Sequence, residues 1–319
     1  MRYDVFNGDA DGLCALQQLR LDSPASARIV TGTKRDVRLL ARVDARAGDE
    51  ITVLDVSVEA NRPALDACLA AGAHVRWFDH HHSGTPPAHP GFEPHLDSDP
   101  AICTSLIVDR HLGGRERPWA IVAAFGDNLH ARAEALARER GLDEDAIDTL
   151  RHLGEALNYN AYGDSVADLR FPPAELALRM RPYADPLAFA RDEDVLGVLL
   201  RGYGDDLALA HAIAPLRETG RTAVYVLPAE PWARRAIGAF ANRLASGAPM
   251  RAHAVLAGRA DGSHVVSVRA PQARPEGAHE LCGRFSTGGG RRGAGGIDRL
   301  PQADFERFIA AFAERYERE

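Results

Sequence analysis

The first part of this chain alternates short apolar runs with stretches of helical periodicity, and this alternation restricts the fold more than any other feature. The apolar runs have the aliphatic and β-branched content of strands, and they are Tyr3–Phe6, Arg28–Val30, Ile51–Leu54 and His74–Phe78. The helical stretches between them are the segment that carries Leu13, Leu16 and Leu19, then Asp36–Val43 and Arg62–Ala71. Strands that alternate with helices of about ten residues are joined by right-handed crossovers. The expected fold class is therefore α/β, with a parallel sheet and helices on both faces.

The rest of the chain predicts a helical stretch followed by a second, smaller α/β unit. Ser83–Pro100 is rich in Pro, Gly and His and favours a loop, and Asn158–Pro173 is irregular. Helical patterns lie at Ala101–His111, Trp119–Phe125, Leu129–Arg140, Glu144–Leu157 and from Pro186 to about Leu216. The second unit has predicted strands at Ala223–Leu227, Ala252–Ala257 and His264–Arg269, and helices at Trp232–Ala245, Ala278–Phe285 and Ala303–Tyr316. We therefore expect an N-terminal domain over 1–185, a helical connector over 186–220 and a C-terminal domain over 221–319.

Charge and cysteine content narrow the class of protein. The chain has 319 residues and a formal net charge of −7, which disfavours a protein that coats nucleic acid by bulk attraction. Its basic residues are arginines except for Lys34, which we interpret as coding bias rather than as a sign of nucleic-acid binding. The 4 cysteines form no C-x-x-C pair, and the sequence shows neither a signal peptide nor an apolar run of membrane-spanning length. We expect a cytoplasmic protein without a membrane partner.

Acidic and histidine side chains follow three of the predicted strands. They are Asp9 and Asp11 after the first strand, Asp55 after the third, and Asp79, His80 and His81 after the fourth. Each aspartate alone is also typical of a turn or a helix cap, whereas consecutive histidines after an apolar strand do not fit a core. The carboxyl ends of parallel strands meet at one edge of the sheet, where ligands bind. Carboxylates and imidazoles gathered there suit Mn²⁺ or Mg²⁺, with Zn²⁺ or iron as alternatives, and a pair of such ions can activate water against a phosphoryl group.

A glycine run in the second unit is the other chemical signal. Gly288, Gly289 and Gly290 are followed directly by Arg291 and Arg292. Glycine allows the backbone to approach a ligand closely, exposed N–H groups bind anions, and arginine adds bidentate contacts to phosphate. A flexible loop with solvated arginines is the alternative interpretation. The run therefore indicates a candidate phosphate-binding element.

Together these residues resemble the DHH phosphoesterase family with its C-terminal DHHA1 domain, over nearly the whole chain. The segments that resemble the four family motifs in order are Asn7–Gly12, Asp55, Asp79–His81 and Gly126–Asp127. The segments that resemble the DHHA1 domain are the run from Gly288 to Gly296, which is similar to its GGGH element, and Ser267–Arg269, which is similar to its substrate-facing strand. The resemblance implies an N-terminal catalytic domain and a C-terminal substrate-binding domain.

The resemblance also implies two divalent metal ions, with Mn²⁺ first and Mg²⁺ or Co²⁺ as alternatives. The implied ligands are Asp9 and Asp55 for one ion, and Asp11, Asp55, His80 and Asp127 for the other, with Asp55 shared. Asp79 would orient this site and His81 would contact the scissile phosphate. The implied substrate-binding residues are Arg269, Gly288, Gly289, Gly290, Arg291 and Arg292.

Three positions depart from the family pattern. Val5 stands where some members have a histidine ligand, and Asn7 stands where RecJ-like members have an aspartate. Both departures weaken the first metal site and leave Asn7 undecided as a ligand. Arg291 replaces the histidine of the GGGH element, which changes the expected contacts with substrate.

The activity that the resemblance implies is a Mn²⁺-dependent phosphoesterase. It would hydrolyse phosphodiester or phosphomonoester bonds of short oligonucleotides or small nucleotides by means of metal-activated water. The alternatives are a 5′→3′ single-strand exonuclease, a pyrophosphatase or polyphosphatase, and a nucleotide-binding regulator with an impaired metal site. The expected partner is the nucleotide substrate, and a homodimer is one of the oligomeric states left open.

Overall fold

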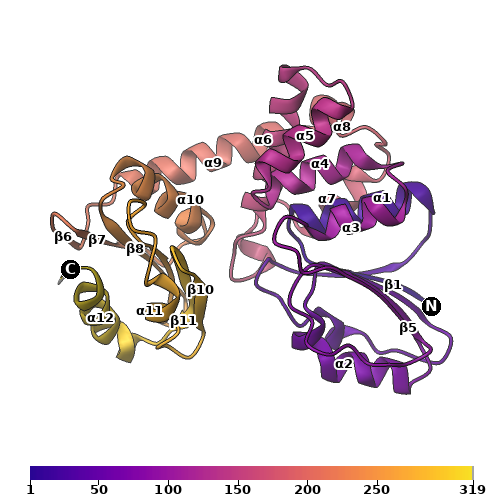
Figure 1. Ribbon diagram of the computed structural model, residues 1–319, viewed down its shortest axis with the longest axis horizontal. Helices are drawn as coiled ribbons and strands as arrows, with labels where there is room; N and C mark the ends of the chain where they lie inside the picture. Colours follow the sequence, from indigo (N-terminus) through magenta and orange to yellow (C-terminus); the bar gives the residue numbers. More distant parts are fainter. Residues whose placement is uncertain (318–319) are drawn as a thin grey trace. The chain divides into compact units, whose positions relative to one another are not determined.

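The computed structural model describes residues 1–317, and the chain divides into two compact units, Met1–Arg201 and Gly202–Glu319 (Figure 1). Each unit contains its own sheet. The helix α9, Val195–His211, contains the division between the two units. Because each unit has a hydrophobic core of its own, each is described separately below.

The first unit is built on a five-stranded sheet in the order β2-β1-β3-β4-β5, in which every neighbouring pair is parallel. The strands are β1 (Arg2–Phe6), β2 (Arg28–Thr31), β3 (Glu50–Leu54), β4 (His74–Asp79) and β5 (Phe92–Leu96). This arrangement confirms the parallel sheet that the sequence predicts. The strand β5 corrects the prediction of a loop over Ser83–Pro100. It is an edge strand in which only Phe92 is buried and Pro94 interrupts the pattern, so its sequence lacks the apolar run of an inner strand.

Helices fill the rest of the first unit. They are α1 (Ala10–Asp22), α2 (Val58–Ala70), α3 (Thr104–His111), α4 (Arg117–Gly126), α5 (His130–Glu139), α6 (Glu144–Asn160), α7 (Pro173–Met180) and α8 (Pro186–Asp192), with short 3₁₀ turns at Leu39–Arg42 and Val166–Asp168. The helix predicted over Asp36–Val43 is therefore wrong except for one 3₁₀ turn. The carboxylate of Asp36 accepts a hydrogen bond from the Thr33 N–H and so closes a turn in place of capping a helix. The helix α7 lies just beyond the segment predicted to be irregular, and the sequence analysis did not predict it.

Side chains of the inner strands alternate between the two faces of the sheet. Phe6 and Phe78 belong to a core shared with α1, α3 and α4. Val5 and Trp77 belong to the opposite core, which α2 completes. This alternation has the period of two that a strand dictates, and it confirms that helices cover both faces.

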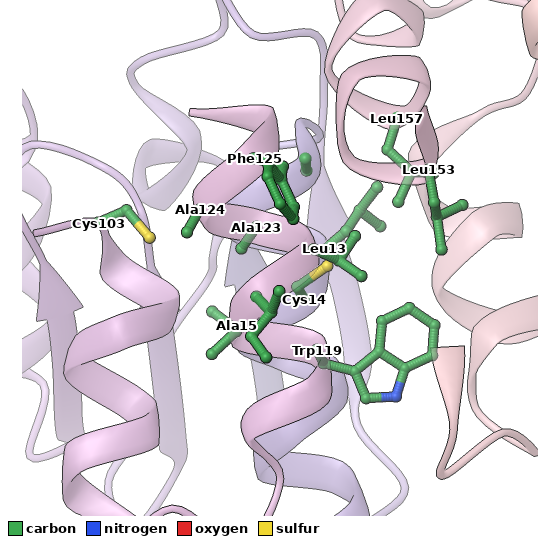
Figure 2. Packing of buried hydrophobic residues seen from close by; sticks show 14 of the residues in the cluster. Leu13, Cys14, Ala15, Cys103, Trp119, Ala123, Ala124, Phe125, Leu153 and Leu157 are labelled. Carbon is green, nitrogen blue, oxygen red and sulfur yellow. The ribbon is translucent and has the colours of Figure 1, made fainter. Parts of the chain in front are cut away.

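The helix α4 lies at the centre of the larger core, where it contacts both α1 and α6 (Figure 2). Its buried face includes Trp119 and Phe125. At its last turn Gly126 lies so close to α1 and α6 that an added Cβ would come within 2.5 Å of the Ala10 Cβ and 2.8 Å of the Gly154 oxygen. Glycine is the residue that permits this approach. The close approach brings the end of α4, and Asp127 after it, to the first turn of α1.

The second unit has a six-stranded mixed sheet in the order β10-β11-β9-β8-β7-β6. The strands are β6 (Arg217–Glu218), β7 (Thr222–Leu227), β8 (Ala252–Gly258), β9 (His264–Arg269), β10 (Gly288–Arg291) and β11 (Ala294–Leu300). Only β7 and β8 pair in parallel, and the other pairs are antiparallel. The helices are α10 (Pro231–Gly247), α11 (Ala278–Cys282) and α12 (Phe305–Glu317), with a 3₁₀ turn at Gln302–Asp304. The unit is thus α/β, as predicted.

The cysteines lie apart from one another inside the cores. Cys14 and Cys103 belong to the core of α1 and α4, Cys68 to the core under α2, and Cys282 to the core of the second unit. All 4 are free and buried. In the described part of the chain no helix has both the length and the apolar character needed to cross a membrane.

Candidate metal centre

The loops that follow β1, β3 and β4 meet at one edge of the sheet, because these strands are neighbours and run in parallel. Potential ligand atoms lie within 4.8 Å of one another in two overlapping groups of residues. One group is Asp11, His80 and Asp127, and the other is Asp55, His80 and His81. The structure therefore brings together side chains that sequence analysis placed at separate strand ends.

Asp55 lies at the centre of this cluster in a strained backbone conformation. Its φ angle is 58°, a left-handed value that costs a residue with a side chain about 1–3 kcal/mol. The Asp55 N–H donates to the Phe78 carbonyl at 3.0 Å, and Oδ1 accepts from the Thr104 hydroxyl at 3.2 Å. Burial and the neighbouring carboxylates, with Asp9 first among them, raise the pKa of Asp55 well above its ordinary value. A nearby cation is therefore needed to hold this carboxylate in its charged form.

The rings of His80 and His81 are each oriented by a hydrogen bond at Nδ1. Nδ1 of His80 lies 3.0 Å from the Ile102 carbonyl oxygen, and Nδ1 of His81 lies 2.7 Å from Oδ1 of Asp79. Because a carbonyl oxygen can only accept, the proton of His80 resides on Nδ1 and its Nε2 is left with a lone pair. That Nε2 lies 3.5 Å from Oδ1 of Asp55. His80 thus has the tautomer of a metal-ligating histidine.

The Asp79–His81 pair has a different electrostatic character. Burial alone would lower the pKa of His81, but the hydrogen bond and the charge of Asp79 outweigh it and raise the pKa. Asp79 is fully buried, and its second oxygen, Oδ2, has no hydrogen-bond partner among the described residues. Such an unpartnered buried oxygen is costly unless a further positive group or solvent reaches it. The Asp79 carboxylate therefore favours the protonated form of the His81 imidazole at the edge of the cluster.

Asp11 and Asp127 come from two different helices. Both oxygens of Asp11 accept backbone hydrogen bonds at 2.7 Å, from the N–H groups of Thr104 and Ser105 in the first turn of α3. Each of these oxygens keeps a further lone pair for another partner. Asp127 follows α4, and its Oδ2 lies 3.9 Å from Nε2 of His80. Burial and the charge of Asp11 raise the pKa of Asp127 to about 6, so this carboxylate also favours a neighbouring cation.

Asp9 also belongs to the cluster, and both oxygens of its carboxylate accept hydrogen bonds from other residues of the protein. Oδ1 accepts from the N–H groups of Asp11 and Gly12 at 3.0 and 3.1 Å, which caps α1. Oδ2 accepts from Nζ of Lys34 at 2.5 Å. Burial alone would raise the pKa of Asp9, but Lys34 lowers it to about 2. Lys34 was absent from the predicted site, although its status as the sole lysine of the chain was a signal that could have found it.

The residues around His80 and the residues around Asp9 differ in how well they fit a divalent cation. Asp11 and Asp127 on one side and Asp55 on the other have carboxylate oxygens close to Nε2 of His80, and this mixture of carboxylates and imidazole suits Mn²⁺ or Mg²⁺. The ion implied at Asp9 does not fit equally well. Asn7 donates through Nδ2 to the Lys34 carbonyl at 3.3 Å and accepts through Oδ1 from the Asp9 N–H at 3.2 Å, while Val5 is buried in the core under α2. A second ion would therefore have to share Oδ2 of Asp9 with the Lys34 ammonium, would have one lone pair of Asn7 Oδ1 within reach, and would find no ligand at Val5.

The predicted substrate-binding residues lie in β9, in β10 and in the turn after β10, and β11 separates the two strands. Arg269 in β9 pairs in register with Ala294 of β11, and its guanidinium donates to the Asn242 side-chain oxygen at 2.7 Å. Arg292 donates to Glu276 at 2.7 Å and is therefore partly neutralised. Arg291 is exposed at the end of β10. The arginines are thus available to a ligand to different degrees.

The glycine run forms the hairpin of β10 and β11, which rules out the alternative of a flexible loop. Gly288, Gly289 and Gly290 pair with Ile297, Gly296 and Gly295. A Cβ on Gly288 would lie 1.9 Å from the Cys282 oxygen of α11, and Gly290 has a φ of 141° that side chains rarely adopt. Gly288 and Gly290 are therefore required by the packing of the hairpin, whereas a Cβ on Gly289 would meet nothing within 4 Å. As β10 is an edge strand, N–H groups on its outer side stay open to an anion, except that of Gly288, which donates to the Phe285 carbonyl at 2.9 Å.

Comparison with known proteins supports the fold. No protein-family model matches this sequence, and no curated protein matches it. The exonuclease RecJ bound to manganese aligns with 97% of this chain and 88% of its own, with a TM-score of 0.62 at 18% identity. RecJ of Thermus thermophilus in complex with Mn²⁺ aligns with 98% of this chain, with a TM-score of 0.64 at 21% identity, and this chain spans 52% of its length. The pGpG-specific phosphodiesterase PggH of Vibrio cholerae aligns over 98% of both chains, with a TM-score of 0.56 at 14% identity.

These structural matches run over nearly the full length of the chain and include both units. The chain therefore has the fold of the DHH-family phosphoesterases, and the resemblance seen in the sequence motifs is confirmed at the level of the fold. A cluster of histidine and aspartate side chains suited to a metal lies at the sheet edge of the first unit.

Proposed function

We propose that this protein is a metal-dependent phosphoesterase that hydrolyses phosphodiester or phosphomonoester bonds in short oligonucleotides or small nucleotides, with Mn²⁺ as the metal. The observation that carries this proposal is the convergence of Asp11, Asp55, His80 and Asp127 at the edge of a DHH-type sheet. A divalent cation bound there supplies charge stabilisation to a phosphoryl oxygen and a nucleophile from water near neutral pH.

The chain's own residues provide the remaining parts of the reaction. Asp79 holds Nδ1 of His81 and directs the opposite ring nitrogen toward the substrate. The partly exposed His81 can donate a hydrogen bond from Nε2 to an oxygen of the scissile phosphate. Thr104 and Ser105 fix the carboxylates of Asp55 and Asp11, so that little reorganisation is needed when substrate arrives.

The second unit contributes the binding of the nucleotide. Arg269, Arg291 and the outer N–H groups of β10 after Gly288 are the proposed contacts for phosphate, and Arg292 is a weaker one because it is paired with Glu276. A short substrate is supported by the structural match to a pGpG-specific phosphodiesterase, which extends over 98% of both chains. The net charge of −7 also disfavours a long polyanion, because a continuous basic groove is what long strands require.

A substrate panel tests the proposal directly. Purified protein with Mn²⁺ is offered labelled dinucleotides to pentanucleotides, a nucleoside bisphosphate, cyclic dinucleotides, pyrophosphate and a long single strand. We expect mononucleotide release from the shortest substrates, and loss of that activity in His80→Ala. The matched control is His74→Ala, because His74 is exposed at the opposite end of the same strand. Absence of turnover on every di- to pentanucleotide would reject the oligonucleotide version of the proposal.

A second candidate function is a 5′→3′ single-strand exonuclease. The observation that favours it is the structural match to two RecJ exonuclease structures. This activity predicts processive degradation of the long strand and a steep loss of rate with salt. Rates that rise with strand length in the same panel would support the exonuclease, and rates that fall with strand length would support the short-substrate enzyme.

A further inference from the structure

Lys34 is the sole lysine of the chain, and its ammonium group lies inside the acidic cluster. Nζ donates to Oδ2 of Asp9 at 2.5 Å and to Oδ1 of Asn158 at 2.9 Å. Its position does not depend on the side chain alone. The Lys34 N–H donates to the Ala161 carbonyl at 2.9 Å, and the Lys34 carbonyl accepts from Nδ2 of Asn7 at 3.3 Å. Backbone and side chain are therefore both held where the cation meets Asp9.

We propose that the ammonium group of Lys34 takes the place of a second divalent ion, so that the protein works with one metal ion and one fixed lysine. The metal site is then the set of Asp11, Asp55, His80 and Asp127, and Asp9 is neutralised by Lys34. This inference rests on the proposed metal-dependent function. It replaces the two-ion site that the sequence motifs imply.

The supply of donor atoms supports one ion. A second ion at Asp9 would need lone pairs from residues beside it, yet Oδ1 of Asp9 caps α1 and Oδ2 receives Lys34. Both polar atoms of Asn7 serve the Lys34 carbonyl and the Asp9 N–H. What remains for that ion is Asp55 with one lone pair each on Oδ2 of Asp9 and Oδ1 of Asn7, and the Lys34 ammonium lies directly against the first of these.

Charge leads to the same conclusion. A divalent ion bound to Asp9 would lie within a few ångströms of the Lys34 ammonium, in a buried place where like charges repel strongly. The lysine already supplies the positive charge that the buried Asp9 requires. One divalent ion beside Asp55 and Asp127 satisfies the remaining carboxylates.

Lys34 also has the geometry to contact substrate. An ammonium has three N–H donors, and the two contacts with Asp9 and Asn158 use two of them. The side chain is 27% exposed, so the third donor can reach a phosphate oxygen at the edge of the cluster. Lys34 is thus proposed to bind the substrate phosphate as a compact positive charge, the role that the missing ion would otherwise serve.

Metal stoichiometry tests the inference without relying on activity. The full-length protein is loaded with Mn²⁺ and freed of excess ion, its Mn content is measured by inductively coupled plasma mass spectrometry, and its electron paramagnetic resonance spectrum is recorded. We expect one ion per chain and the hyperfine pattern of an isolated Mn²⁺. Two ions per chain with the spectrum of a spin-coupled pair would overturn the inference and leave the proposed phosphoesterase activity standing.

Two variants make the test specific to Lys34. Lys34→Ala combined with Asn7→Asp removes the ammonium and supplies a carboxylate, so we expect a second ion and a spin-coupled spectrum. Lys34→Arg keeps a positive charge beside Asp9 and is expected to stay at one ion. If the double variant folds, as judged by circular dichroism, and still binds one ion, Lys34 is not what excludes the second ion. If it does not fold, the Lys34→Arg variant decides, because a second ion there would overturn the inference.

The test of the one-ion site can be distinguished from the test of the proposed phosphoesterase activity. One ion per chain without hydrolysis of any substrate in the panel would keep the inference about the site and reject the phosphoesterase. Absence of any bound ion in the wild type would reject both.

Discussion

The acidic cluster of the first unit and the glycine hairpin of the second are both candidate sites, yet they are built in opposite ways. In the cluster, side chains from α1 and from the ends of β3, β4 and α4 meet, and hydrogen bonds from distant segments hold Asp11, Asp55 and His80. In the hairpin, the backbone of Gly288–Gly290 pairs closely with β11, and the arginines beside it are exposed or paired locally.

The two sites are therefore preorganised in different ways, one by buried charged side chains and the other by close packing of the backbone. The cluster concentrates buried charge, which is costly to fold and which becomes favourable only with cations in place. The hairpin concentrates close backbone packing, which needs glycine for steric reasons and leaves charge at the surface. Changes in the cluster should therefore act on metal binding and turnover, and changes in the second unit should act on stability or on affinity for substrate.

The largest expected effect is that of Asp55→Asn. The change removes the central carboxylate and keeps its shape, so we expect turnover to fall by more than about 100-fold and Mn²⁺ affinity to fall by at least about 10-fold. Steady-state kinetics and metal titration measure both. Retention of turnover within about 3-fold of the wild type would remove Asp55 from the site.

The same variant should be more stable than the wild type when metal is removed by a chelator. The pKa of Asp55 in the folded state lies above its unfolded value, because it is buried beside other carboxylates. An acid with a raised folded pKa makes the folded state less stable as the pH rises above the unfolded value of about 4. Thermal unfolding of the metal-free proteins at neutral pH should therefore show a higher Tm for Asp55→Asn, and a lower Tm would contradict the argument.

The next effect concerns the position of Asp127 rather than its charge. Gly126→Ala places a Cβ 2.5 Å from Ala10 and 2.8 Å from the Gly154 oxygen, so α1, α4 or α6 must shift. We expect a loss of about 1–3 kcal/mol in the free energy of unfolding, with weaker Mn²⁺ binding. The matched control is Gly238→Ala in α10, where an added Cβ meets nothing within 4 Å. That control should be neutral or stabilising by up to about 1 kcal/mol, and equal behaviour of the two variants would show that the crossing tolerates a side chain.

An intermediate effect is expected from a histidine inside the second sheet. His253 in β8 is buried, and burial together with Arg251 lowers its pKa to about 4. Since the unfolded value is about 6.5, the second unit keeps its full stability above that pH and loses it as the pH falls toward 4. His253→Gln should therefore lose less Tm on acidification than the wild type does. His74→Gln, at an exposed position of β4, serves as the control and should follow the wild type.

The smallest effects should separate the two arginines of the second unit. Arg269→Ala removes a guanidinium from the end of the inner strand β9, so we expect KM for a dinucleotide to rise by about 10-fold with kcat little changed. Arg292→Ala removes an exposed arginine that is already paired with Glu276, and its effect should stay within about 2-fold. A larger effect on kcat than on KM in Arg269→Ala would place this residue in the chemistry rather than in binding.

Sequence reasoning was accurate where a pattern was local and regular. Short apolar runs located β1, β2, β3 and β4, and the parallel order followed from the helices between them. It was wrong where tertiary packing overrides local preference. The edge strand β5 has too few apolar residues to be visible, and the glycines of β10 resemble a loop until α11 packs against them. Asp36–Val43 has helical periodicity, but the Asp36 side chain closes a turn.

The sequence by itself determined the α/β class and the kinds of side chain at the ends of the strands, because strand alternation and motif spacing are local properties of the chain. Only the tertiary structure decided which of those side chains meet. The packing of Gly126 against Ala10 brings Asp127 to Asp11, and the contact of Lys34 with Asp9 joins residues 25 positions apart. The periodicity of the sequence does not predict such contacts, since they depend on how the helices and loops pack against the sheet. The number of metal ions that the site can hold therefore depends on the tertiary structure, and above all on the contact between Lys34 and Asp9.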